Sequence, residues 1–194
     1  ILVGSGALHA SEAVLELAET LQAPVSANRG GRGIISEDHE LGASNVAANN
    51  LWRDADVLIG IGSRLEMPYM RWSNPMGAIV DPLAPPHLIR IDIDPEEMER
   101  LVPHAGIIAD SAEGTRALTK AIKGYKPRST ALADIAHSKS WANEKVQEIK
   151  PHVDYLKVIR EALPRDGFFV EEINQIGFTS TFAFPVYEPR TYVT

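Results

Sequence analysis

Cysteine is absent from the 194-residue chain, so disulfides, cysteine-based zinc sites and thiol nucleophiles are all excluded. No apolar run is long enough to cross a bilayer. Basic residues are also few, with 19 Lys and Arg against 26 Asp and Glu and a formal net charge of −7. That balance argues against a nucleic-acid or anionic-membrane partner, each of which needs a basic face. We therefore expect a cytoplasmic protein whose partner is a small molecule, with no nucleic acid and no membrane.

Several catalytic motifs are missing as well. The six histidines stand singly, without the spacing of a metal site. No G-x-S-x-G occurs, which excludes a serine-hydrolase elbow, and the glycine-rich loop at 28–33 lacks the lysine and hydroxyl of a P-loop. We expect no metal ligand in this chain.

What is present is an alternation of short apolar strands and amphipathic helices over residues 1–124. Strands are expected at 1–3, 24–27, 56–62, 88–93 and 107–109, and helices over 10–23, 43–54, from 95, and over 112–123. The strand at 56–62 is almost wholly apolar, which is typical of a parallel strand buried on both faces. Five βα units predict an α/β fold with a doubly wound, mostly parallel, Rossmann-like sheet.

The pattern changes after Gly124. The polar stretch YKPRST at 125–130 predicts a linker, and helices are expected over 135–150 and 153–163. A short strand at 168–170 and a helical turn at 171–177 follow. We expect a central domain at 1–124, a linker and connecting helix at 125–151, and the start of a second α/β domain at 152–194. Because strand-like residues stand at both ends, we expect the chain to be part of a longer protein.

The junction IRIDIDPEEMER at 89–100 passes directly from a strand into a helix, the place where open α/β sheets bind ligands. Asp94 is a good N-cap, Pro95 suits the first helical position, and Glu97 stands where a capping box needs it. Asp92 is suited to a ribose hydroxyl or an adenine amino group, although a solvated turn explains it equally well.

Glycine turns supply further candidates. Gly4-Ser5-Gly6 follows a strand, so its amides could approach a phosphate, or it could simply be a glycine turn. His9 stands where a dinucleotide fingerprint needs a third glycine, and Ala27-Asn28 supply no acidic residue at the end of strand two. These departures weaken a dehydrogenase interpretation.

Arginines provide the remaining candidates. The loop NRGGRG at 28–33 carries Arg29 and Arg32 and suits either an anion cradle or a solvated surface loop. Arg64 follows Gly62 at the end of a central strand, and it suits a phosphate, a carboxylate, or an ion pair with Glu66 or Asp92.

Five segments in order carry a resemblance. They are GSGA, PVSANRGGRGIISEDHELG, ADVLIGIGSRL, HLIRIDIDPEEM and GIIAD. Together they resemble the central domain of thiamine-diphosphate-dependent enzymes of the acetolactate synthase and pyruvate decarboxylase type, over about residues 1–124. EEINQIGF followed by FPVYEPRTYVT is similar to the opening of the same family's carboxyl-terminal domain.

This resemblance implies a parent enzyme of three α/β domains that uses thiamine diphosphate and Mg²⁺. Such enzymes decarboxylate 2-keto acids, with or without carboligation, and form a homodimer or homotetramer. The glutamate that activates the cofactor and the G-D-G…N segment that holds Mg²⁺ match nothing in this chain. No catalytic residue is carried over, and we expect the chain to be inactive alone.

In the acetolactate synthase branch the central domain also binds FAD. The resemblance puts Gly4, Ser5 and Gly6 near the pyrophosphate, Asn28 and Arg29 near the flavin, Gly62 and Arg64 along the phosphates, and Asp92, Ile93, Asp110 and Ser111 around the adenosine. Two departures stand against FAD. The segment Leu65-Glu66-Met67-Pro68 lacks the expected base, and Ser44 replaces an expected histidine. FAD, an adenine nucleotide such as ADP, and an empty site all stay open.

The alternative is a stand-alone module of the electron-transfer-flavoprotein type, which binds FAD or an adenine nucleotide. Such a module has a similar alternation of strands and helices. The residues after Tyr125 argue against it, because such a module should end soon after its adenosine-binding strand. The missing cysteines likewise remove the zinc module of a sirtuin-like protein.

Overall fold

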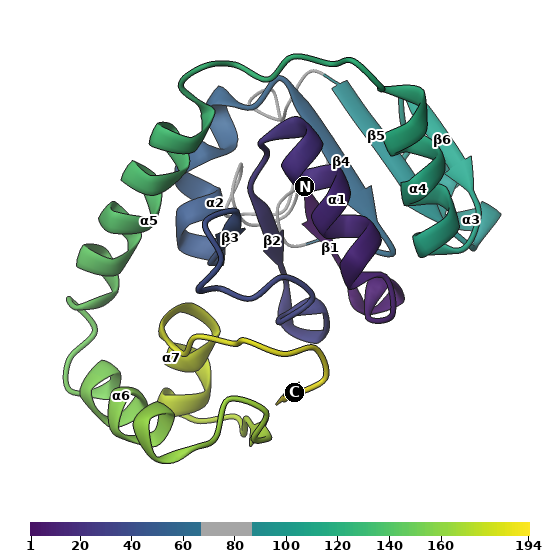
Figure 1. Ribbon diagram of the computed structural model, residues 1–194. Coiled ribbons are helices and arrows are strands. Elements are labelled where there is room, and N and C mark those ends of the chain that lie inside the picture. The colour runs from purple at the N-terminus through teal and green to yellow at the C-terminus, as the bar shows by residue number, and fades with distance from the viewer. Residues whose placement is uncertain (67–86) are drawn as a thin grey trace.

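A computed structural model describes residues 1–66 and 87–194, and its centre is a six-stranded parallel sheet (Figure 1). The strands are β1 (Leu2–Val3), β2 (Val25–Ala27), β3 (Gly42–Ala43), β4 (Val57–Ile61), β5 (His87–Asp92) and β6 (Ala105–Ile108). Their order across the sheet is β3-β2-β1-β4-β5-β6. This is the doubly wound Rossmann order, and it confirms the expected fold class. The strand order reverses between β1 and β4, which makes their carboxyl ends the switch point.

Helices α1 (Ser11–Leu21) and α4 (Ser111–Ala121) pack side by side over one face of the sheet (Figure 1). α1 buries Val14, Leu17 and Ala18, which recur at helical spacing and contact sheet residues such as Val3 and Ile61 in one core cluster. α4 begins at its N-cap Asp110, whose carboxylate accepts hydrogen bonds from the amides of Ala112 and Glu113. The tight packing of α1 and α4 brings the start of α4 to the turn after β1.

The expected helix over 43–54 is wrong at its start. Ala43 belongs to β3, and helix α2 runs only over Asn45–Leu51 before a 3-10 turn at Trp52–Asp54. Ser44 lies between them and caps α2 by accepting a hydrogen bond from the amide of Ala47. A two-residue strand leaves no periodic pattern in the sequence, so five strands were expected in this region where the sheet has six.

Two other boundaries differ by a few residues. β6 begins at Ala105, two residues before the expected strand, because β5 offers pairing partners from Ile89 to Asp92. Helix α3 covers Pro95–Arg100, with Asp94 as N-cap and proline in the first turn, as expected.

The carboxyl-terminal part contains α5 (Ala131–Val146), α6 (His152–Ala162), β7 (Phe169–Val170), α7 (Gln175–Ala183) and β8 (Tyr192–Val193). β7 and β8 pair in parallel, so residues 169–193 form a β-α-β unit. The helical turn expected at 171–177 is wrong, because the helix starts at Gln175 and continues to Ala183. Its apolar residues follow no single stripe, which is why periodicity did not reveal it. The division at residues 124 and 151 stays a prediction.

Residues 152–194, from α6 to the end of the chain, are called the C-terminal block, and this block lies beside the loop that follows β2 (Figure 1). The connecting helix α5 packs against α2, and α7 contacts both of them. Among the described residues, no helix is long and apolar enough to cross a membrane.

Candidate cofactor crevice and C-terminal cavity

The turns after β1 and β4 meet at the switch point and bond to each other. The amide of Gly4 donates to the carbonyl of Ile61 at 3.0 Å, and the amide of Gly6 donates to the carbonyl of Gly62 at 3.1 Å. A Cβ on Gly4 would lie 2.2 Å from the Gly62 oxygen. Gly62 itself has a φ of +55°. These glycines therefore allow two backbone turns to touch, and two of the amides expected near a pyrophosphate already have acceptors.

Asp110 and Ser111 are brought to the turn after β1, together with His9. The Nε2 atom of His9 lies 2.8 Å from Oδ2 of Asp110, and this hydrogen bond is the main reason that the pKa of Asp110 is lowered. The Ser111 hydroxyl donates to the carbonyl of Gly6 at 2.9 Å and lies 3.3 Å from the same His9 nitrogen. The expected place of Asp110 and Ser111 around an adenosine stays a prediction.

Sequence reasoning gave His9 no role, although its place at the missing third glycine was a usable signal. The three side chains are not a catalytic triad. A triad needs the serine and the carboxylate on opposite ring nitrogens, whereas here both lie near Nε2.

Arg64 lies beside α3 and is paired there with carboxylates. Its Nε lies 3.2 Å from Oε1 of Glu97, and its Nη1 lies 3.4 Å from Oε1 of Glu66. The predicted ion pair with Glu66 is confirmed. The alternative pair with Asp92 is not found among the described ranges. Residues 67 and 68, on which the sequence comparison for FAD also depended, lie outside the described residues.

Glu97 joins three arginines instead of capping its helix. Its carboxylate accepts from Arg90 at 3.1 Å and from Arg100 at 2.8 Å, in addition to Arg64. The hydrogen bond from Arg100 and then that from Arg90 lower the pKa of Glu97 to about 2. Arg90 is buried and also donates to the carbonyl of Ser63 at 3.0 Å, so it ties α3 to the turn after β4.

The capping role expected for Glu97 is therefore wrong. Asp92 takes that place, because its carboxylate accepts from the amide of Asp94 at 3.2 Å. Asp94 caps α3 as expected, accepting from the amide of Glu96 at 2.9 Å. Ile93 lies between them with 71% of its surface exposed at the carboxyl edge of the sheet.

The loop at 28–33 is exposed at Arg29 and buried from Gly31 to Gly33, so it is not a solvated surface loop throughout. Asn28 accepts a hydrogen bond from the amide of Arg29, and Arg29 points to Glu171 of the C-terminal block at 3.7 Å. Arg32 is only 4% exposed and is bonded to Glu37 at 2.8 Å. As an anion-binding candidate Arg32 is thus wrong, because it is already buried and paired.

Arg32 anchors the C-terminal block instead. Its guanidinium donates to the carbonyl of Ser180 at 3.1 Å and to that of Phe184, and it lies 4.5 Å above the ring centre of Tyr192. Gly33 has a φ of +85°, and a Cβ there would lie 2.1 Å from the Glu188 oxygen. The loop after β2 is therefore shaped to hold the C-terminal block.

Tyr192 contacts Arg32 of this loop, Ser180 of α7, and Glu171 in the segment before α7. Its hydroxyl donates to Oε2 of Glu171 at 2.6 Å and lies 2.8 Å from the Ser180 hydroxyl. Burial, followed by the Glu171 contact, raises the pKa of Tyr192 to about 12. The phenol is therefore held neutral as a hydrogen-bond donor.

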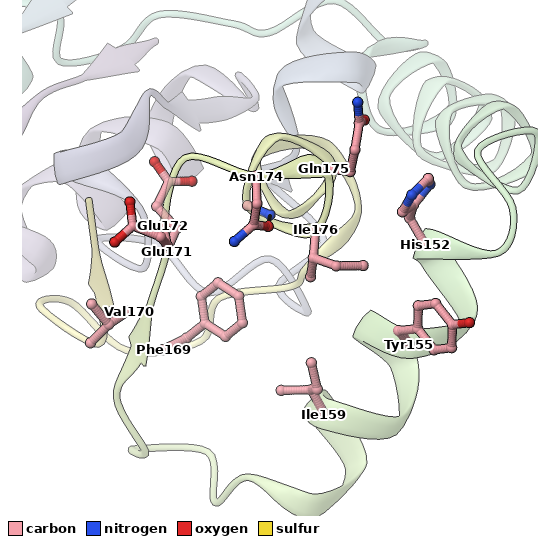
Figure 2. Close-up of a pocket in the computed structure, with 11 residues that line it drawn as sticks. His152, Tyr155, Ile159, Phe169, Val170, Glu171, Glu172, Asn174, Gln175 and Ile176 are labelled. Atoms are coloured by element: carbon pink, nitrogen blue, oxygen red, sulfur yellow. Dashed lines mark hydrogen bonds between the residues drawn. The ribbon is translucent and has the colours of Figure 1, made fainter.

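A cavity of about 670 Å³ opens in the C-terminal block between α6, β7 and the start of α7 (Figure 2). Phe169, Ile176 and Ile159 surround it, and His152 and Tyr155 reach it from α6 (Figure 2). Its remaining lining residues are Val170, Glu171, Glu172, Asn174, Gln175 and Gly177. The space is mainly apolar. Across residues 1–66 and 87–194, no three His, Cys, Asp or Glu side chains group closely enough to hold a metal ion.

Comparison with known proteins identifies the family. Residues 1–118 match the family model described as the central domain of thiamine pyrophosphate enzymes. The match covers more than half of the chain, and the sheet has the corresponding α/β architecture. The chain belongs to this family, as the sequence segments indicated.

The relatives are enzymes named for several reactions. The probable 2-ketoarginine decarboxylase AruI of Pseudomonas aeruginosa is 28% identical over 204 residues, covering 100% of this chain and 34% of that protein. Acetolactate synthase isozyme 1 large subunit of Escherichia coli is 22% identical, covering 100% of this chain and 35% of its own length. A probable acetolactate synthase large subunit of Methanocaldococcus jannaschii is 32% identical over 77% of this chain and 24% of that protein. The chain thus spans about a third of the length of the relatives that it matches from end to end.

Proposed function

We propose that this chain forms the central domain and the start of the carboxyl-terminal domain of an enzyme dependent on thiamine diphosphate and Mg²⁺. The proposed reaction is decarboxylation of a 2-keto acid, with or without transfer to a second carbonyl. One observation carries the proposal: the doubly wound sheet matches the family over residues 1–118 and is joined, through the loop after β2, to a second β-α-β unit.

Thiamine diphosphate, when bound, supplies the electron sink for decarboxylation. The described residues of this chain would hold the parts of the enzyme in place and would not take part in the reaction. Asn28 to Glu37 hold the C-terminal block, and the block presents the apolar cavity at the start of α7. We propose that the diphosphate and Mg²⁺ are bound by residues outside this chain, and that the chain alone does not turn over substrate.

A cytoplasmic location, a homodimer or homotetramer, and the absence of nucleic-acid and membrane partners remain part of this proposal. The alternative of a stand-alone flavin or adenine-nucleotide module gains no support from the relatives, whose names describe a decarboxylase and synthases.

The test is a comparison of the isolated 194-residue chain with the longest natural protein that contains it. Each is incubated with thiamine diphosphate, Mg²⁺ and, in turn, pyruvate, glyoxylate and 2-ketoarginine, and carbon dioxide release is measured. The longer protein should release carbon dioxide from one of them only when thiamine diphosphate is present, and the isolated chain should release none above a protein-free control.

Turnover by the isolated chain would refute the assignment of catalysis to residues outside it. Cofactor-independent turnover by the longer protein would overturn the proposed chemistry. If the longer protein binds thiamine diphosphate but acts on no 2-keto acid, the substrate class is wrong.

A further inference from the structure

We infer that the switch-point crevice of the central domain is closed by the protein's own polar groups and does not take FAD or ADP. Open α/β sheets ordinarily bind ligands in this place, at the carboxyl ends of the strands where the strand order reverses. The inference concerns binding by the central sheet alone and does not depend on the proposed reaction.

The backbone of the crevice is the first observation. A dinucleotide fingerprint uses glycines so that the pyrophosphate can approach the chain closely. Here the space beside Gly4 and Gly6 is filled by the turn after β4, and a Cβ on Gly6 would lie 2.9 Å from the Gly62 Cα. On the other side, a Cβ on Gly31 would lie 2.7 Å from the Val3 oxygen. These glycines serve contact between backbones, and the amides of Gly4 and Gly6 already donate to the carbonyls of Ile61 and Gly62.

The second observation is the imidazole at the third-glycine position. His9 is hydrogen-bonded to Asp110, and Ser111 is bonded to the Gly6 carbonyl. These contacts cross from the turn after β1 to the start of α4. A pyrophosphate approaching the start of α4 would meet the carboxylate of Asp110, which repels it.

The third observation concerns the arginine best placed for a phosphate. Arg64 is paired with Glu97 and Glu66, and the backbone oxygen of Arg64 also accepts a hydrogen bond from Arg100. Arg64 is 63% exposed, so a phosphate could reach its guanidinium, but it would lie beside the carboxylates of Glu66 and Glu97, which repel it. Glu97 is held strongly, because buried Arg90 and half-buried Arg100 share it.

Asn28 and Arg29 are the remaining residues expected near a flavin, and the partners of both belong to the protein itself. Asn28 caps its own turn, and Arg29 faces Glu171 of the C-terminal block. The His9–Asp110 pair thus connects the segments that follow β1 and β6, and the Arg64–Glu97 pair connects those that follow β4 and β5. The central domain is a scaffold held by internal ion pairs.

The first test is made on the full natural protein, purified without any step that strips cofactors. Flavin absorbance and chromatography of the heat-released supernatant should show no FAD and no ADP. Titration calorimetry with each should show no binding heat, and neither should change the melting temperature. Co-purification at one molecule per chain would overturn the inference. So would a rise of about 5 °C or more in melting temperature at a saturating excess of FAD or ADP.

A second test opens the crevice. The double variant Asp110→Asn, Glu97→Gln removes the carboxylate that would repel a pyrophosphate and weakens the hold on Arg64, while the introduced amides keep a cap for α4 and a hydrogen-bond acceptor for Arg90. We expect this variant to gain measurable ADP binding in calorimetry, with His137→Ala, on the exposed side of α5, as a control that gains none. A folded double variant that still ignores ADP would contradict the assignment of the closure to these two pairs. The measurements on the unaltered protein decide the inference even if the variant fails to fold.

Discussion

The region of the central sheet buries a larger share of its apolar side chains than the C-terminal block does. The sheet buries most of its apolar residues, and its large exposed ones include Ile93, Val102 and Ile108, around the edge strand β6. The C-terminal block leaves Phe168, Ile173 and Phe178 exposed by 69%, 85% and 52%. Parallel strands are normally covered on both faces, so the block depends on packing against something else.

Within this chain, that support is the loop after β2. Arg32, Gly33 and Glu37 give the block one buried cation and a backbone surface to lie on. The contrast implies that the sheet should fold on its own contacts, whereas the block should loosen whenever the loop is damaged.

The largest effect is expected where two backbone segments of the sheet touch. Gly4→Ala places a Cβ 2.2 Å from the Gly62 oxygen, which neither turn can avoid. We expect a loss of about 4 kcal/mol or more in unfolding free energy and little soluble protein, measured by urea unfolding.

Gly124→Ala is the matched control, since nothing lies within 4 Å of a Cβ there. Its φ of +92° carries strain, so it should cost about 1 kcal/mol. Equal losses in the two variants would show that the turns after β1 and β4 are not in close contact.

Arg32→Met should separate the two regions. Removing this buried guanidinium leaves Glu37 and two carbonyls without their donor, at a cost of about 3 kcal/mol. Hydrogen exchange should accelerate in α7 and β8 while α1 and β4 keep their protection. Arg29→Met, at a half-exposed guanidinium 3.7 Å from Glu171, should cost less than about 1 kcal/mol. Uniform loss of protection across both regions would contradict the comparison.

Glu97→Gln tests an ion-pair cluster that belongs to the sheet alone. The pKa of Glu97 in the folded protein is about 2, below its ordinary 4.5, so its stabilisation is complete above about pH 4.5 and lost as the pH falls toward 2. At pH 7 the variant should lose about 1–2 kcal/mol, allowing for solvent screening. Its deficit against the unaltered protein should shrink in acid. A deficit that does not change between about pH 7 and pH 3 would contradict the ion-pair account.

Apart from the control variants, Tyr192→Phe should have the smallest effect, confined to the block. It removes the hydroxyl that bonds Glu171 and Ser180, at a cost of about 1 kcal/mol. In the unaltered protein, ultraviolet titration should show one tyrosine ionising only near pH 12, and the variant should lack that step. If the late step persists in the variant, it belongs to another tyrosine.

Several local features could be predicted from the sequence because each depends on neighbours in the chain. Asp94 before Pro95 capped α3 as expected, and the apolar run at 56–62 became the buried strand β4. The βα alternation was enough for the fold class. β3 and α7 were missed or misplaced, because two residues carry no periodicity and α7 has no apolar stripe.

The contacts of the candidate site residues were less predictable, because residues that form ion pairs and hydrogen bonds there are far apart in the chain. Arg29 and Arg32 look alike in one glycine-rich loop, yet Arg29 is half-exposed and Arg32 is buried against residues about 150 positions away. His9 gained its role from Asp110, 101 residues further on. Glu97 stands at a capping position, but its carboxylate forms ion pairs with three arginines instead of accepting a hydrogen bond from the backbone at the start of α3.

By itself, the sequence determined the alternating strands and helices, the glycine turns and the family. These depend on periodicity and on backbone conformations that only a few residues adopt. Only the tertiary structure decided which charges meet. Ion pairs and hydrogen bonds form through space, between residues that are far apart in the chain. The packing of α1 against α4 brought His9 to Asp110, and the packing of the C-terminal block against the loop after β2 buried Arg32.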